Sequence, residues 1–216
     1  MFRHCYRAQY RSEAVIETVK RFAPLWKELL KENRILSATA FRYGADNLFL
    51  YWECSHTGDL SVEDVFPGLT PFLVPWPGEA QPRYYIPMLE LYHSYDPSPE
   101  EEPAWKRESH VEPEGMMSIM VPEMMASYIF LHHQLQEEAP GDNGKDLTIW
   151  FDGPLAILYT ERPKRRVDQP RPGKLKTHNT PDNWGEVMDP YFVPFPDGNL
   201  YEYASVLLTM SHGDID

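Results

Sequence analysis

The sequence predicts an α+β protein built from two copies of a β-α-β-β-α-β unit. Three observations predict this class. Strand-like and helix-like apolar periods alternate along the chain, glycine and proline mark the connections, and three groups of residues recur in the same order. With 216 residues, of which 42% are hydrophobic, the chain is long enough for two small compact halves.

The first copy is expected to contain four strands and two helices. The expected strands are residues 2–10, 35–43, 48–54 and 84–93. The expected helices are residues 13–30 and 62–73. Pro24 lies inside the first helical pattern and should kink it, because proline lacks a backbone donor. The turn residues 44–47 predict that the second and third strands form a hairpin.

The repeat rests on three matches with slowly growing offsets. The segment 71–77 reappears as 190–196 at an offset of 119, which continues through the last strand of each copy. The segment 50–53 matches 158–161 at an offset of 108. The helix residues match at an offset of 106, and the pairs are Phe22/Tyr128, Leu25/Leu131, Leu29/Leu135 and Glu32/Glu138. Chance does not readily place three matches in the same order.

The second copy is interpreted through the first. Its expected strands are residues 116–121, 146–151, 155–161 and 201–210. Pro122 stands at the first helical position, where its missing donor costs nothing, and Asp182 is expected to cap the short second helix. This order of elements is the ferredoxin-like split βαβ arrangement, in which helices cover one face of each sheet. The two open faces are therefore expected to pack against each other around a ligand-binding lumen.

The boundaries follow from composition. We expect a first repeat over residues 1–95, an acidic, proline-rich linker over residues 96–114, and a second repeat over residues 115–216. The most acidic stretch of the linker, residues 96–103, is expected to bury nothing. Because the partner sheet is attached covalently, the chain is expected to be a monomer that contains its own pseudo-dimer, with further dimerisation left open.

Charge and composition exclude several classes of partner. A net charge of −13 argues against nucleic acid and anionic membranes, and no apolar run is long enough to span a bilayer. The N-terminal residues enter a strand pattern without an apolar signal region, so the expected location is the cytoplasm. Cys5 and Cys54 lack metal-ligand spacing and are expected to be buried thiols, and neither a metal nor a cofactor is predicted.

The segments 21–29 and 47–53 carry a family resemblance. The predicted helix carries Pro24, Trp26, Glu28 and Leu29, and an Asn-Leu-Phe-Leu strand follows it. With these residues the chain resembles L-rhamnose mutarotase, a member of the dimeric α-β barrel superfamily. The resemblance covers residues 2–93 directly and implies a barrel of paired sheets and a sugar substrate. In that family a tyrosine and a histidine one helical turn apart act on the sugar, and the matching positions here are Thr18 and Phe22.

Three functions stay open at this stage. The leading hypothesis is a mutarotase-like protein that interconverts sugar anomers, which requires two proton-transferring groups near the substrate. Phe22 can transfer no proton, so the alternative is a non-catalytic binding protein of the same fold. A small monooxygenase-like enzyme is the third, on the ground that the superfamily also includes such enzymes.

The candidate site residues are polar or aromatic side chains on predicted strands and on the helix. The candidate catalytic residues are His132, which matches Trp26, and the strand histidines His4 and His93. The candidate substrate-binding residues are Arg3, Tyr6, Arg7, Trp26, Tyr51, Glu53, Trp76 and Glu161. Aromatic faces with hydrogen-bonding side chains suit a sugar, and the predicted partner is therefore a small molecule.

Overall fold

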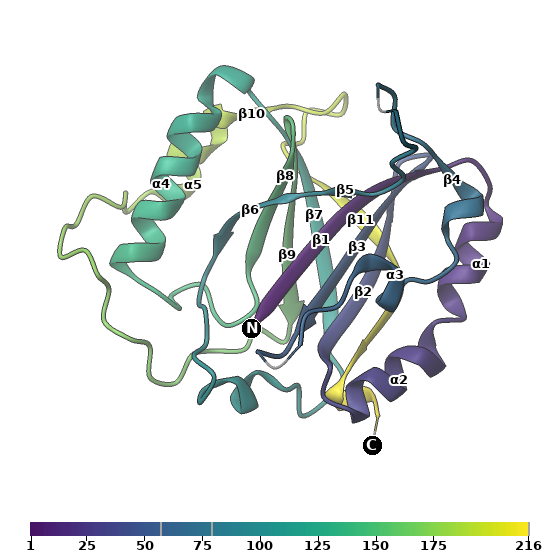
Figure 1. Ribbon diagram of the computed structural model, residues 1–216. Helices are drawn as coiled ribbons and strands as arrows, with labels where there is room; N and C mark the ends of the chain where they lie inside the picture. The colour runs from purple at the N-terminus through teal and green to yellow at the C-terminus, as the bar shows by residue number, and fades with distance from the viewer. Residues whose placement is uncertain (57, 79, 216) are drawn as a thin grey trace. The chain divides into compact units, whose positions relative to one another are not determined.

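The computed structural model describes residues 1–56, 58–78 and 80–215, and the chain divides into two compact units (Figure 1). Unit 1 consists of Met1–Met88, Pro97–Pro113 and the C-terminal segment from Ala204. Unit 2 consists of Leu89–Asp96 and Glu114–Tyr203. Each unit combines antiparallel strands with a few helices, which confirms the predicted α+β class.

The sheet of unit 1 has the strand order β4-β1-β3-β2-β11, with β5 also paired to β1. Its strands are β1 (Phe2–Tyr10), β2 (Ile35–Tyr43), β3 (Asn47–Cys54), β4 (Leu73–Val74), β5 (Ile86–Pro87) and β11 (Glu202–Ser211). The hairpin predicted from the turn at 44–47 is confirmed, since β2 and β3 pair from Tyr43↔Asn47 onward. Side chains alternate between the two faces of each strand.

Two successive helices, α1 (Ala14–Lys20) and α2 (Ala23–Lys31), follow β1 (Figure 1). Pro24 lies in the first turn of α2, so the predicted kink is a complete break between two helices. The expected helix over residues 62–73 is much shorter, because it comprises only α3 (Val62–Val65) and the 3-10 turn η1 (Thr70–Phe72). Trp26 and Leu30 of α2 pack with Leu50 and Trp52 of β3 in the core of unit 1.

The sheet of unit 2 has the strand order β7-β9-β8-β6, and β10 pairs with β7. Its strands are β6 (Leu89–His93), β7 (Glu112–Met120), β8 (Thr148–Asp152), β9 (Leu155–Arg162) and β10 (Phe192–Val193). The 3-10 turn η3 (Pro122–Met124) leads into α4 (Met125–Glu138), and α5 (Trp184–Met188) continues into η4 (Asp189–Tyr191). The expected Asp182 cap is wrong: the residue before α5 is Asn183, which makes no side-chain capping bond.

The last strand of each repeat belongs to the other unit. The predicted strand 84–93 is interrupted at Met88, so that β5 stays on β1 while β6 pairs with β8 in unit 2. In the same way β11 pairs with β2 in unit 1, with Ser211 opposite Ser37. The compact units therefore do not coincide with the expected segments 1–95 and 115–216, because each contains strands from both halves of the sequence.

The expected linker is a packed part of unit 1. It forms the 3-10 turn η2 (Glu102–Trp105), and the side chains of Trp105 and Arg107 are buried. Arg107 forms an ion pair with Glu53 of β3, and the backbone N–H of His56 donates to Glu102 Oε2 at 2.7 Å. The expectation that residues 96–103 bury nothing is wrong, because Pro97 is buried and Glu102 accepts the bond from His56.

Among the described residues, no helix combines the length and the apolar character needed to cross a membrane. The longest helix of unit 2, α4, has 14 residues, whereas a span needs about 20.

Candidate functional site in unit 2

A pocket of about 920 Å³ lies in unit 2 beside the C-terminal half of α4. Its wall includes Tyr92 of β6, Ile149 of β8, Leu158 of β9 and His132 of α4. The segment 173–183 is called the strap below. Its residues 175–182, except Asn179, line the pocket, and Trp184 of α5 lines it as well. This volume lies in the range of small-molecule sites, and the mixture of apolar and polar side chains is typical of them.

His132 is the chemically most distinctive residue of this pocket. It lies one helical turn after Tyr128, and its Nδ1 donates a hydrogen bond to the Tyr128 carbonyl oxygen at 3.0 Å. Because a carbonyl can only accept, the proton is on Nδ1 and Nε2 keeps its lone pair. Within the described residues, Nε2 has no hydrogen-bond partner. Burial lowers the pKa of His132 to about 4, partly opposed by the Tyr128 carbonyl, so the ring is neutral near pH 7.

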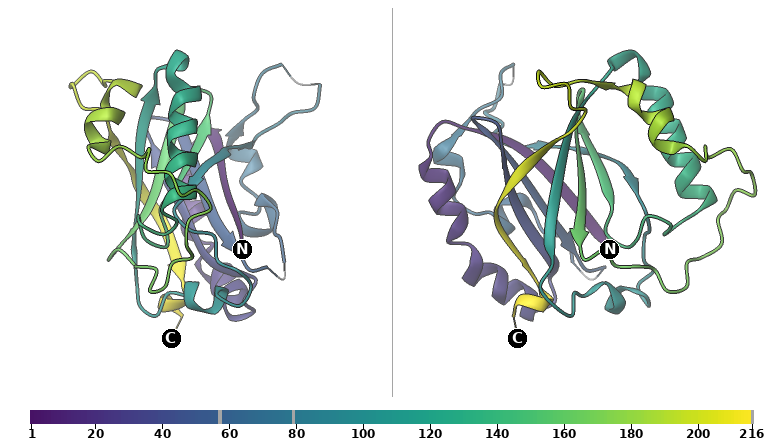
Figure 2. Two further views of the ribbon diagram at one scale, coloured as in Figure 1. Left: turned by 90° about the vertical axis from the view of Figure 1, so that its left-hand side faces the viewer. Right: turned by 180° about the vertical axis from the view of Figure 1, so that it is seen from behind.

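Aromatic rings fix the orientation of His132. Tyr128 lies 4.0 Å from it between ring centroids, and Trp184 meets it edge-on at 4.9 Å. Tyr92 meets it edge-on from β6 at 5.5 Å. Consistent with the ring contact, α4 and α5 lie side by side in all views (Figure 2). The imidazole therefore presents one fixed geometry to the pocket.

A smaller cavity of about 110 Å³ adjoins the pocket and shares His132, Ile149, Leu158 and Trp184 with it. Its other lining residues are mainly apolar or aromatic, and they include Tyr128, Met188, Phe192 and Tyr201. His132 thus lies in the wall shared by a wide pocket of mixed polarity and a narrow, mainly apolar cavity.

A comparison with α2 of unit 1 shows how this space arises. The position that the predicted repeat matches to His132 holds Trp26, which is fully buried and donates from Nε1 to the Val65 carbonyl at 2.8 Å. Phe66 packs edge-on against Trp26 at 5.3 Å, much as Trp184 packs against His132. The large indole of Trp26 fills the core of unit 1, whereas the smaller imidazole lines a cavity in unit 2.

The strap is held on α4 by the side chain of Glu138. The carboxylate accepts hydrogen bonds from Thr177 Oγ1 at 2.6 Å, from the Asn179 N–H at 2.9 Å and from the Thr180 N–H at 3.0 Å. The hydroxyls of Thr177 and Thr180, followed by these backbone donors, hold the pKa of Glu138 well below its usual range. At Gly173 a Cβ would collide with the carbonyl oxygens of Glu137 and Glu138, so the close approach of the strap requires glycine there.

Of the three predicted catalytic histidines, His132 lines the pocket. His93 lies on β6 and its Nδ1 is 2.7 Å from Glu90 Oε1, outside the residues that line the pocket. His4 lies on β1 in unit 1, where its ring stacks on Trp52 at 4.7 Å. The structure therefore does not bring the three histidines together within one unit.

None of the eight predicted substrate-binding residues lines the pocket of unit 2. Trp26 is a core residue and Tyr6 stacks on Trp52 at 5.4 Å. Arg7 donates to Asn47 Oδ1 at 2.9 Å, and its guanidinium lies over the Trp76 ring at 5.1 Å. Arg3 stands opposite Glu53 in the pairing of β1 with β3.

Tyr51, Glu53 and Glu161 belong to buried polar networks that occur once in each unit. In unit 1 the Tyr51 hydroxyl donates to Glu53 Oε1 at 2.8 Å. In unit 2 the Tyr159 hydroxyl donates to Glu161 Oε1 at 2.7 Å, with Arg165 Nε 3.8 Å from its other oxygen. Burial opposes ionisation of Glu53, but the charge and hydrogen bond of Arg107, together with Arg3 and Tyr51, lower its pKa to about 2.

Sequence reasoning missed Tyr92, Trp184 and the strap as parts of the site. The strap carries Lys174 and Lys176 in a proline-rich stretch, a composition that predicts a solvated loop. The available signal was the match of His132 to Trp26, since replacing a core indole by an imidazole leaves unfilled volume beside it.

No protein-family model and no curated protein matches the sequence. Two solved structures resemble the fold. One is a "putative monooxygenase" from Fusobacterium nucleatum, with 8% identity, a TM-score of 0.44 and coverage of 98% of this chain and 94% of that one. The other is a "putative monooxygenase" from Lactobacillus acidophilus, with 7% identity, a TM-score of 0.47 and coverage of 99% and 98%. The chemistry of the pocket therefore has to come from its own residues.

Proposed function

We propose that the protein binds a small, flat, largely apolar molecule in the pocket of unit 2, and that a hydroxyl group of this molecule donates a hydrogen bond to Nε2 of His132. The observation that carries the proposal is His132 itself: a neutral, oriented imidazole with an available acceptor at the wall of two adjoining cavities. Tyr128 and Trp184 supply aromatic surface on which a flat ring can pack.

Phenols and enols fit these requirements best. Their planar bodies suit the apolar walls formed by Ile149, Leu158 and Trp184, and their hydroxyl is a good donor to a neutral imidazole. A cationic ligand is disfavoured near His132, where burial already opposes positive charge. A hydroxyl whose proton moves toward His132 becomes more electron-rich, which is the first step of both proton-transfer and oxygen-dependent reactions of such compounds.

The pH dependence of binding follows from the pKa of His132. The imidazole accepts a hydrogen bond only while Nε2 is unprotonated, and the pKa of about 4 means that this holds throughout the neutral range. Affinity for a phenol should therefore be constant from about pH 5 to pH 8 and should fall as the pH drops through 4. An acidic carboxylate ligand would show the opposite trend, because protonated His132 would attract it.

Calorimetric titration with a panel of phenols and their methyl ethers tests the proposal, because the ethers keep the shape and lack the donor. We expect the phenols to bind more tightly by about tenfold, equivalent to one hydrogen bond of about 1.4 kcal/mol. His132→Phe keeps a flat ring, removes the acceptor and should abolish this difference. His133→Phe is the matched control, since His133 is the exposed neighbour in α4.

Equal binding of phenols and ethers by the natural protein would sink the proposal. Oxygen uptake with a bound phenol would extend it to the monooxygenase-like class, whereas binding without turnover would define a binding protein.

A second candidate, sugar anomer exchange, is favoured by Tyr92. Burial raises the pKa of its phenol, so it is a neutral proton donor close to the neutral acceptor His132. Such a pair could in principle open a hemiacetal, which needs one group to accept and one to donate a proton. The mutarotase family and the pairing of the two repeats as an internal barrel stay proposals. Saturation-transfer NMR with rhamnose and related sugars decides the case: exchange no faster than in buffer rules this candidate out.

A further inference from the structure

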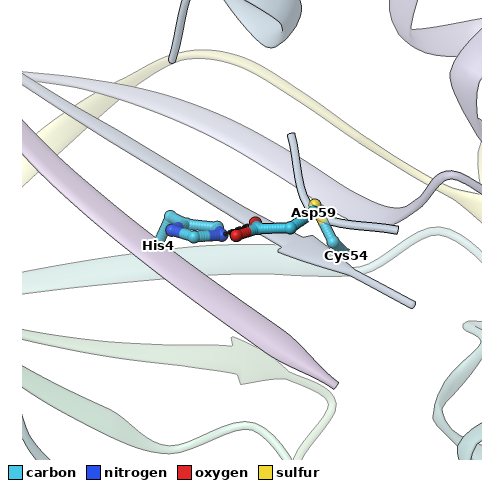
Figure 3. A group of neighbouring side chains, drawn as sticks. All are labelled: His4, Cys54 and Asp59. Carbon is cyan, nitrogen blue, oxygen red and sulfur yellow. Dashed lines mark hydrogen bonds and ion pairs between the residues drawn. The ribbon is translucent and has the colours of Figure 1, made fainter. Parts of the chain in front are cut away.

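Three side chains with metal-binding atoms meet in unit 1, one of them about 50 residues before the other two in the sequence (Figure 3). They are His4 of β1, Cys54 at the end of β3, and Asp59 of the following loop. One ligand atom from each lies within 4.8 Å of the other two. Among the described residues, no other group of three such side chains gathers in this way.

The sheet positions two of these side chains before any ion binds. His4 is paired with Trp52 in the register of β1 and β3, and its ring stacks on the indole at 4.7 Å with 23° between the planes. Cys54 lies two residues after Trp52, on the same face of the strand, and is fully buried. The imidazole and the thiol therefore have rigid supports.

Asp59 supplies the third ligand from a more adaptable position. Its Oδ1 is 2.6 Å from His4 Nε2, and its side chain is 58% exposed. Bonds of about 2.0–2.3 Å in a tetrahedral site place ligand atoms about 3.3–3.8 Å apart. Asp59 would therefore have to move outward by roughly 1 Å, which its exposure permits, while the thiol moves slightly inward.

We propose that His4, Cys54 and Asp59 bind a divalent transition-metal ion of the zinc type, with water at the fourth position. Nitrogen, sulfur and oxygen donors together suit a borderline-soft cation and disfavour magnesium or calcium, which prefer oxygen alone. Three protein ligands leave one position of a tetrahedral site for water, which is the open coordination of ions that react or exchange ligands. The thiol must lose its proton to the solvent when the ion binds, so binding weakens as the pH falls.

Cobalt(II) titration of chelator-treated full-length protein tests the site directly. We expect one equivalent to produce the thiolate-to-cobalt charge-transfer absorption of a tetrahedral site, and zinc to displace it. Cys54→Ala should abolish the band. Cys5→Ala is the matched control, because Cys5 is also a free, buried cysteine but lies outside the cluster.

A second variant, Asp59→Asn, tests the site even if Cys54→Ala does not fold, because Asp59 is exposed and its replacement leaves the core intact. We expect zinc affinity to drop by at least about tenfold in this variant, measured by competition with a chelating indicator. A missing cobalt band in the natural protein, or unchanged zinc affinity in Asp59→Asn, would overturn the proposal and leave His4 and Asp59 as a plain hydrogen-bonded pair.

Discussion

Single side chains decide what each unit can do. The predicted repeat matches Trp26 of α2 to His132 of α4, yet Trp26 completes a core and His132 lines a cavity. Burial lowers the pKa of His132, whereas for Glu53 it raises the pKa and the neighbouring Arg107 lowers it. Glu53 has Arg107 beside it and stays charged, whereas His132 has no carboxylate partner and stays neutral.

The ion pair of Glu53 and Arg107 gives a stability prediction at this scale. Both side chains are almost completely buried, so Glu53→Gln leaves a buried positive charge without its carboxylate. We expect a loss of about 3–5 kcal/mol in the free energy of urea unfolding at pH 7. Glu28→Gln is the control: Glu28 pairs with Lys31 at 2.8 Å but is exposed, and the expected loss is about 0.5 kcal/mol or less. Equal losses of unfolding free energy in the two variants would show that burial does not determine how much an ion pair stabilises the fold.

Both residues make the fold less stable as the pH falls, because the folded-state pKa of each lies below its unfolded value. Glu53, with a folded pKa of about 2 against 4.5, stabilises the fold above pH 4.5, and this contribution is lost as the pH falls toward 2. His132, with a folded pKa of about 4 against 6.5, adds a penalty that is absent above pH 6.5 and grows as the pH falls toward 4.

At the scale of elements, the strap depends on one carboxylate at the end of α4. Glu138→Gln replaces one acceptor oxygen by an NH₂ group that faces donors, so at least one of its bonds to Thr177, Asn179 or Thr180 must be lost. We expect the amide protons of Asn179 and Thr180 to exchange several-fold faster in hydrogen-exchange measurements. Glu32→Gln is the control, because Glu32 follows α2 in unit 1, is exposed and lies outside the strap, so its replacement should leave the strap unchanged. Unaltered exchange in Glu138→Gln would show that other contacts hold the strap.

The sequence predicts elements well where a local pattern is strong. The strands 2–10 and 35–43 agree with the structure, because alternation acts locally. Near Pro24 the structure has a break between two helices where a kink in one helix was expected. The strap and the packed linker could not be predicted in this way. Their positions depend on Glu138 and on Arg107, each of which meets a partner about 40 to 55 residues away.

The metal cluster illustrates the same limit. Sequence reasoning found no ligand spacing around Cys54, because two of the three ligands lie on paired strands 50 residues apart and only the sheet register brings them together. Register is a property of the folded sheet and is weakly encoded in any single strand.

At the scale of the whole molecule, the exchanged strands make each unit depend on both halves of the chain. The strand β11 pairs with β2 through six residue pairs, and the hydroxyls of Thr39 and Thr209 lie 2.9 Å apart across them. A repeat cut at the expected boundary keeps β2 but exposes its edge. Unpaired edges of this kind promote association with other chains.

A fragment of residues 1–113 tests this dependence, since it contains every segment of unit 1 except the C-terminal one that carries β11. Without β11, Ile35–Tyr43 becomes an open edge and apolar partners such as Leu208 and Met210 are missing from the core of unit 1. We expect the fragment to associate or to unfold without cooperativity, as seen by sedimentation and urea titration. Adding a peptide of residues 201–215 should restore a monomer with a cooperative unfolding transition. The same peptide with Thr209→Pro should restore it poorly, because proline removes a backbone donor and adds a ring in the paired strand. A fragment that is monomeric, soluble and cooperatively folded by itself would mean that unit 1 is complete without the strand supplied by the second repeat.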